Sequence, residues 1–180
     1  SALQLVESRW CSYLDDDNEL EPSHLSSLLE CVSVSGLPAA HSWRSLWTQD
    51  GQPFILRDRH PWCRDLETSR ILFTQYRDAG IYHVGSKVIY DQVVPYCRLK
   101  SMVDTSEWIF NIEFIRKIGF VTDYTVDDWQ TSRSEDSKLL DSVVASGLRI
   151  PSTRESSLRY YLGGYSNNWS TEGSQLEGWA

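Results

Sequence analysis

Two kinds of apolar spacing recur along this chain of 180 residues. Towards both ends, and again over 66–78, apolar residues recur every three or four positions, which indicates amphipathic helices. The helices expected from this spacing and from capping residues cover 2–14, 23–35, 66–78, 135–146 and 152–163. In the middle of the chain, apolar and polar residues alternate, which indicates strands. The strands expected there cover 43–48, 53–57, 81–84, 87–94, 107–115 and 120–126.

This order of elements predicts an α+β fold. We expect an antiparallel-leaning sheet of about five or six strands with flanking N- and C-terminal helices, because several links between strands are too short for parallel crossovers. No internal repeat or shift in composition divides the chain. A single compact domain over residues 1–180 is therefore expected, with an irregular tail from about residue 165 that is rich in Ser, Asn and Gly.

Two segments in the middle carry specific expectations. Asp50-Gly51 supplies residues that tolerate positive φ, so Trp43–Thr48 and Pro53–Arg57 are expected to pair as a hairpin. In 107–115, strict alternation favours a strand, although Thr105 and Gly119 would also frame a helix. The strand is expected to turn Glu107 and Glu113 towards water. Its core-facing side chains would be Trp108, Phe110, Ile112 and Phe114.

The four cysteines are Cys11, Cys31, Cys63 and Cys97. Their spacing matches neither a zinc knuckle nor a redox dithiol motif. A core of this size does not need disulfides, so we expect four free thiols.

The charge balance narrows the class of partner. The chain has 17 basic and 25 acidic residues and a net charge of −8, which disfavours general binding to nucleic acid. Part of the acidic excess is clustered in Asp15, Asp16 and Asp17. This cluster is either a solvated loop or a docking site for a basic protein.

Aromatic residues are abundant, with 8 Trp, 9 Tyr and 5 Phe. Such rings often anchor interfaces, and Trp43 and Trp47 on the expected hairpin are candidate contacts. No phosphate-binding glycine loop, dinucleotide fingerprint, nucleophile elbow or paired-His zinc motif is present. The leading hypothesis is a non-enzymatic protein-interaction domain, such as an acidic inhibitor or immunity-type binder of a basic partner.

A basic segment offers a different hypothesis. Arg57, Arg59 and Trp62 could bind an anion, or nucleic acid in a nucleic-acid-associated module. The alternative is a structural loop in which Asp58 and Asp65 neutralise the arginines.

The segment Tyr82-His83-Val84-Gly85-Ser86 resembles, in its residue types, a strand of one class of ADP-ribosyltransferases, where a His holds NAD. That resemblance implies a nucleotide-ligand enzyme with NAD as cofactor. His83, Tyr90 and Glu177 would be its catalytic residues. The triplet Gln175-Leu176-Glu177 is similar to the Gln-x-Glu of another branch of that superfamily.

The leading hypothesis requires no metal and no cofactor. His24, His41, His60 and His83 are too far apart in sequence for a local metal site. No apolar run approaches the ~20 residues that span a bilayer. We expect a cytoplasmic or otherwise intracellular protein that contacts no membrane, with a removed secretion signal as the alternative.

Overall fold

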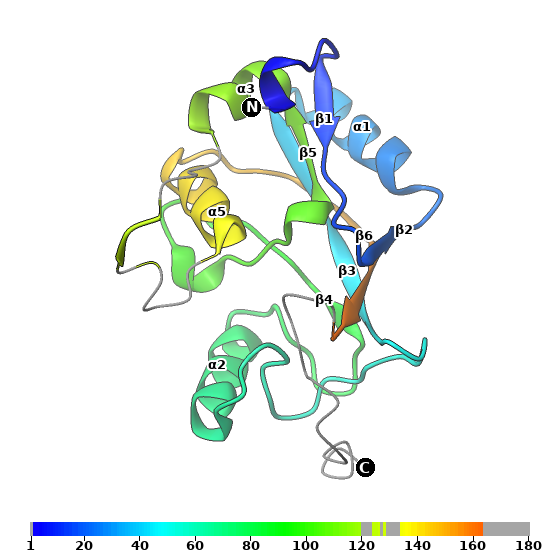
Figure 1. Ribbon diagram of the computed structural model, residues 1–180, viewed down its shortest axis with the longest axis vertical. Coiled ribbons are helices and arrows are strands. Elements are labelled where there is room, and N and C mark those ends of the chain that lie inside the picture. Colours follow the sequence, from blue (N-terminus) through cyan, green and yellow to red (C-terminus); the bar gives the residue numbers. More distant parts are fainter. Residues whose placement is uncertain (1, 120–123, 127, 129–133, 164–180) are drawn as a thin grey trace.

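The computed structural model describes residues 2–119, 124–126, 128 and 134–163. This part of the chain contains four helices and a six-stranded mixed sheet (Figure 1). The helices are α1 (His24–Ser35), α2 (Leu66–Asp78), α3 (Ile112–Ile118) and α5 (Glu135–Ala145). The strands are β1 (Trp10–Ser12), β2 (Asn18–Leu20), β3 (Ala39–Thr48), β4 (Val88–Ile89), β5 (Trp108–Asn111) and β6 (Ser152–Leu162). Three short 3-10 helices are η1 (Ala2–Gln4), η2 (Arg98–Lys100) and η3 (Thr105–Glu107).

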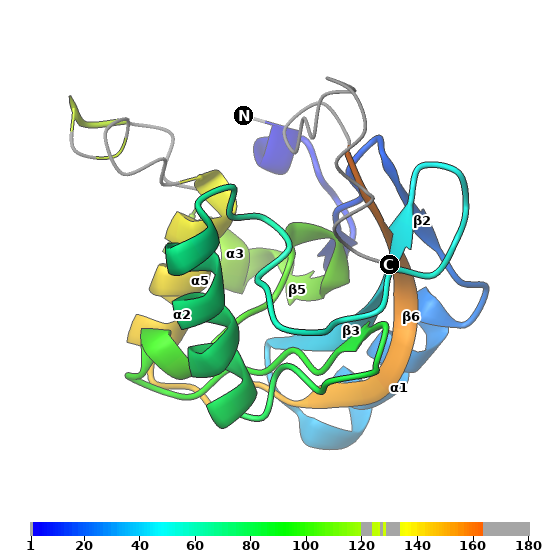
Figure 2. The same cartoon turned by 90° about the horizontal axis from the view of Figure 1, so that it is seen from below.

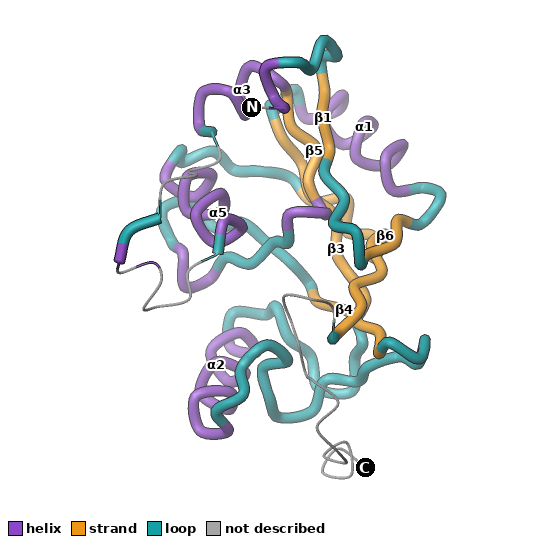
Figure 3. Tube along the Cα trace, in the orientation of Figure 1, coloured by secondary structure: helices purple, strands orange, loops and turns teal. Residues whose placement is uncertain are grey.

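The strands follow the order β1-β5-β3-β6-β2, and β4 also pairs with β3. The sheet is curled, and residues 13–17 alone connect its two edge strands, β1 and β2 (Figure 2). Helix α1 lies on one side of the sheet, while α2 and α5 lie on the other (Figure 1). The α+β class is confirmed. The expected antiparallel-leaning arrangement is wrong, because the longest pairing, β3 with β6, is parallel. The two strands lie side by side in Figure 3.

Three helices form where the sequence predicts them. Helix α2 begins after Asp65, whose side chain accepts a hydrogen bond from the Thr68 amide at 2.8 Å. Helix α1 ends at Gly36, which has a φ of 67° that favours glycine. Helix α5 begins after Ser134, whose hydroxyl accepts from the Ser137 amide.

The expected N-terminal helix over 2–14 is wrong. Only Ala2–Gln4 is helical, as the short η1, and Trp10–Ser12 pairs with β5 instead. The Ser12 hydroxyl donates to the Trp108 carbonyl at 2.6 Å. Pairing with a strand far along the chain therefore overrides the helical spacing.

The expected C-terminal helix over 152–163 is also wrong, because this segment forms β6. The Ser152 and Thr153 hydroxyls accept from the amides of Arg154 (3.1 Å) and Glu155 (3.2 Å). Arg154 has a φ of 60°, and the register with β3 shifts nearby, which is the behaviour of a β-bulge. The residues Ser152-Thr-Arg-Glu155, whose pattern is that of a helix N-cap, thus form a β-bulge at the start of β6.

The expected hairpin is confirmed at its turn. Trp47 and Pro53 form an antiparallel bridge, and the Phe54 amide donates to the Leu46 carbonyl at 3.0 Å. The pairing does not continue beyond this point, because Arg44 and Ser45, which precede Trp47 in β3, pair with β4 instead.

The segment 107–115 divides into two elements. The alternation correctly predicts β5, but the Asn111 side chain then accepts from the amides of Glu113 and Phe114 and starts α3. Glu113 is exposed as expected, whereas the expectation for Glu107 is wrong because its side chain is fully buried.

The remaining strand predictions fare less well. Of 81–84 and 87–94, only Val88–Ile89 is a strand. The expected strand over 120–126 lies largely outside the described residues, as does the expected irregular tail from 165. The four cysteines are free thiols and are half-buried.

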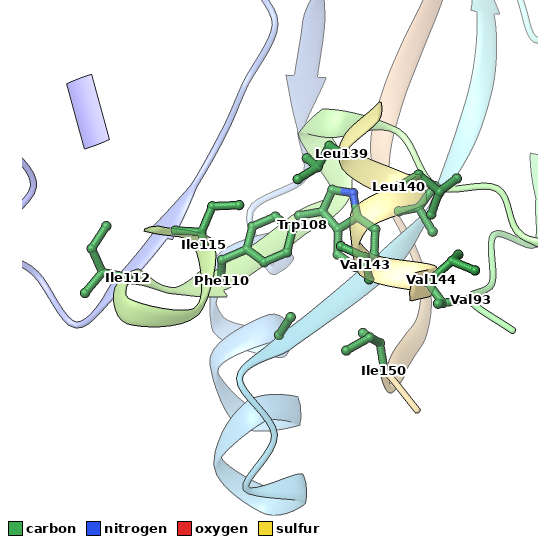
Figure 4. Close-up of a cluster of buried hydrophobic side chains, with 12 residues drawn as sticks. Val93, Trp108, Phe110, Ile112, Ile115, Leu139, Leu140, Val143, Val144 and Ile150 are labelled. Carbon is green, nitrogen blue, oxygen red and sulfur yellow. The ribbon is translucent and has the colours of Figure 1, made fainter. Parts of the chain in front are cut away.

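The largest apolar cluster lies between the sheet and α5. Trp108 and Phe110 of β5 point towards α5, with their rings stacked at 5.0 Å between centroids (Figure 4). Leu139, Leu140, Val143 and Val144 of α5 close this cluster. The opposite face of β5 is also buried, because Ile109 packs with Leu28 and Val32 of α1.

Candidate functional site

A buried group of charged side chains lies beside the middle of β3. Arg44 is 2% exposed, and its guanidinium Nη1 lies 2.8 Å from Glu107 Oε2 and 3.8 Å from Asp104 Oδ2. Its Nη2 lies 3.5 Å from Asp91 Oδ1. We call Arg44, Asp91, Asp104 and Glu107 the Arg44 cluster. It joins β3 to the loop after β4 and to η3.

Aromatic rings cover the guanidinium. Its Cζ lies 5.1 Å from the centroid of the Trp62 ring and 5.6 Å from that of Tyr160, distances typical of cation–π contacts. The Trp62 indole also donates to the Tyr160 hydroxyl at 3.2 Å. Trp62 is thus held half-buried against side chains of β3 and β6.

Burial shifts the protonation of the groups around Arg44. It raises the pKa of Asp91 to about 7, against the attraction of Arg44, and it raises the pKa of Glu107 well above its usual range. Burial, with repulsion from Arg44, lowers the pKa of His60 to about 4. Burial lowers the pKa of Arg44, but the Coulomb attraction of its carboxylates outweighs this and raises the pKa overall. The cluster therefore contains one permanent cation and two carboxyls that hold protons to a higher pH than usual, and the neighbouring His60 is neutral.

Carboxylates extend from this cluster to the surface. Asp104 caps η3 and repels both Asp15, in the loop after β1, and Asp136, in the first turn of α5. Burial, followed by repulsion from Asp104, raises the pKa of Asp15 to about 6. Burial raises the pKa of Asp136 to about 7, although the Thr105 hydroxyl donates to it.

We call this region the acidic surface. It consists of Asp15, Asp16, Asp17, Asp104, Glu135 and Asp136. The Ser106 hydroxyl donates to Asp15 Oδ2 at 3.1 Å and fixes the loop on η3. Apart from Arg44 beside Asp104, no described Lys or Arg forms an ion pair with these carboxylates. The clustered aspartates predicted from sequence are thus joined by three carboxylates from distant segments.

Trp43 and Trp47, which were predicted to contact a partner, are half-buried and already pack against other residues of the protein. Trp43 donates to the Asp91 carbonyl at 3.0 Å and packs against Tyr90. The Trp47 ring lies 3.9 Å from Lys87 Nζ and 5.3 Å from Arg159 Cζ. Trp47 therefore already makes cation–π contacts with two of the protein's own side chains.

The predicted basic site is only partly assembled. Arg57 is exposed, Arg59 lies 3.9 Å from Asp58, and Trp62 is turned inward to Arg44. Trp62 therefore does not form the exposed ring that was predicted to stack on a ligand beside Arg57 and Arg59.

Two of the three residues from the resemblance lie together. His83 is exposed and its ring centroid lies 4.5 Å from that of Tyr90. The segment around His83 is a turn rather than a strand. Glu177 lies outside the described residues.

Sequence reasoning missed Arg44, Asp91, Asp104, Glu107 and Asp136 as functional candidates. No local signal marked Arg44, because its alternation with Trp43 and Ser45 places it on the polar face of the expected strand. Its partners could not be found from local patterns either, since Glu107 is 63 residues away in sequence.

Comparison with known protein families finds no match, and comparison with curated proteins finds no similar sequence. Among the described residues, no group of three or more His, Cys, Asp or Glu is arranged to hold a metal ion. None of the helices in that same part of the chain has the length and apolar character needed to cross a membrane.

Proposed function

We propose that this protein is an interaction domain that binds a basic protein partner through the acidic surface. The observation that carries the proposal is the crowding of Asp15 and Asp136 around Asp104, with their pKa values raised to about 6 and about 7. Like charges held together raise the free energy of the folded protein, and a cation from a partner relieves this repulsion. A Lys or Arg side chain would supply that cation, and a net charge of −8 would speed the encounter.

The neighbouring strand supplies a second part of the proposed surface. Glu19 of β2 accepts from the Tyr161 hydroxyl at 3.0 Å and lies 3.6 Å from Arg159 Nη1. Arg159 in turn contacts the Trp47 ring. Trp47, the anchor proposed from sequence, is therefore linked through Arg159 to β2, the strand that follows Asp15, Asp16 and Asp17.

Removing two carboxylates from the acidic surface should weaken binding of a basic probe. For Asp15→Asn/Asp136→Asn, we expect about fivefold weaker binding of a fluorescent hexalysine peptide, because two partly buried ion pairs are lost. Fluorescence anisotropy measures the affinity, which should also fall as salt rises. The matched control is Asp58→Asn/Asp78→Asn, which removes the same charge from aspartates that pair with arginines of the protein. Equal weakening in both double variants would show that only net charge matters and would refute a specific site.

The pH dependence gives an independent check on the same proposal. Asp15 and Asp136 have raised pKa values, so both are largely protonated at about pH 5.5 and ionised at about pH 8. A cation binds the ionised forms, so affinity should increase over this window and protons should be released on binding. The double Asn variant should lose most of this dependence, whereas the control should keep it.

A second candidate function, an enzyme that acts on NAD, is favoured by one contact. Exposed His83 packs on Tyr90, and Tyr90 packs on Trp43 at 4.7 Å between centroids, so three rings could meet a planar ligand. Incubation with NAD and measurement of released nicotinamide tests it. Release that disappears in His83→Ala would favour the enzyme over the binding domain.

A further inference from the structure

The buried charges around Arg44 do not balance. The side chains of Asp91 and Glu107 are both 0% exposed, and that of Arg44 is 3% exposed. His60 is neutral at pH 7, because its pKa is lowered to about 4. Two ionised carboxylates would therefore leave one uncompensated negative charge in the interior, which costs several kcal/mol even after relaxation.

The hydrogen bonds of Glu107 show where a compensating proton would be held. Its Oε2 accepts from Arg44 Nη1 at 2.8 Å and from the Asp104 amide at 2.7 Å. Its Oε1 and both carboxyl oxygens of Asp91 are buried and receive no hydrogen bond from any described group. Buried polar atoms are nearly always paired. A proton on Oε1 would pair it with an Asp91 oxygen, and a hydrogen bond from Glu107 is among the causes that lower the pKa of Asp91.

We infer that Glu107 carries a proton at neutral pH and donates it to Asp91, so that Arg44, Asp91 and Glu107 together are electrically neutral. This proton ties η3 to the loop after β4, both of which contact Arg44 of β3. Its loss at alkaline pH returns an uncompensated charge to the interior and weakens the attachment of these segments to the sheet. The Arg44 cluster therefore holds η3 and the loop after β4 on the sheet more firmly at neutral than at alkaline pH.

The groups that face the carboxyl pair favour retention of the proton. Asp104, in the turn before η3, repels both carboxylates, whereas Arg44 of β3 attracts them. Burial raises the pKa of Tyr82, after α2, so this phenol is neutral, and His60 is neutral because its pKa is lowered to about 4. The Tyr160 ring of β6 lies 5.6 Å from Arg44 Cζ. Burial is the largest cause and raises the pKa of both Asp91 and Glu107.

The sign of the linkage follows from the raised pKa. The folded protein holds the Glu107 proton at pH values where the unfolded chain has released it, so stability from this group is full below its unfolded pKa. It is lost as pH rises through the window up to the folded pKa, with the unfolding constant increasing up to tenfold per pH unit.

The test compares Glu107→Gln with the natural protein, since Gln has the shape and neutrality of a protonated Glu. We expect the pH slope of the unfolding constant between about pH 6 and 8 to be lower by about one proton in the variant. Glu30→Gln on the exposed face of α1 is the matched control and should leave the slope unchanged. Equal slopes in Glu107→Gln and the natural protein would overturn the inference.

Infrared spectroscopy reads the proton without relying on a variant that folds. The carbonyl band of a protonated carboxyl should be present in the natural protein at about pH 8, where Asp15 and Asp136 are largely ionised. It should be absent from Glu107→Gln, or shifted in Asp91→Asn if the first variant does not fold. A spectrum at about pH 8 with only ionised carboxylates would overturn the inference.

Discussion

Replacing Arg44 with methionine is expected to lower the free energy of unfolding by about 3–5 kcal/mol at about pH 8. Methionine fills much of the same volume but leaves Asp91 and Glu107 buried without a cation. Chemical denaturation measures the change. The loss should be smaller at about pH 5, because protonation of both carboxyls removes the uncompensated charge. A loss below about 1 kcal/mol at about pH 8 would contradict the central place of Arg44 in the fold.

Two further variants separate the charge of Arg44 from its packing. Arg77→Met removes an exposed guanidinium that lies 2.9 Å from Asp78, and should cost less than about 1 kcal/mol. In Arg44→Met/Asp91→Asn/Glu107→Gln, none of the three substituted side chains is charged, so part of the stability lost in the single variant should return. If the triple variant is less stable than Arg44→Met, the loss comes from packing against Trp62 and Tyr160.

The helices α1, α2 and α5 could be predicted because their signals are local. Each has apolar side chains on one face and a recognisable residue at one end, such as Asp65 before α2 or Gly36 after α1. A local signal fails where the same residues fit both a helix and a strand. Ser152-Thr-Arg-Glu155 reads as a helix cap, yet β6 forms because Leu158, Tyr160 and Leu162 are buried at period two beside β3.

The parallel pairing of β3 and β6 could not be predicted from local sequence. Short links between consecutive strands indicate antiparallel pairing, whereas β3 and β6 are separated by residues 49–151. The same separation hides the candidate site. In the sequence, Asp15 belongs to a run of three aspartates, and only the fold brings it near Asp104 and Asp136.

Glu107 shows how a charged residue can mislead a burial prediction. The alternation of 107–111 is real, but it does not tell which face is exposed, because both faces of β5 are covered. Helix α1 covers Ile109, and the Glu107 carboxyl is buried because it accepts hydrogen bonds from Arg44 and from the Asp104 amide. These polar partners, rather than hydrophobicity, decide the environment of Glu107.

The second large effect is expected at Phe110, whose replacement with Ala should cost about 3–5 kcal/mol. The ring is 0% exposed, stacks on Trp108 and contacts Tyr13 edge-on at 6.4 Å between centroids. Its loss opens a cavity between β5 and α5 that these rigid neighbours cannot fill. Denaturation with urea at neutral pH, where the Arg44 cluster is unchanged, measures the effect.

Phe114→Ala is the control for this prediction, because it deletes the same ring from the same apolar cluster. Phe114 is half-buried on α3, so its loss should cost less than that of Phe110. Ile109→Ala tests the other face of β5 and should cost about 2–5 kcal/mol, since Ile109 packs under α1. If Phe110→Ala were costly and Ile109→Ala nearly neutral, β5 would be buried on one face only, and the position of α1 against the sheet would be wrong.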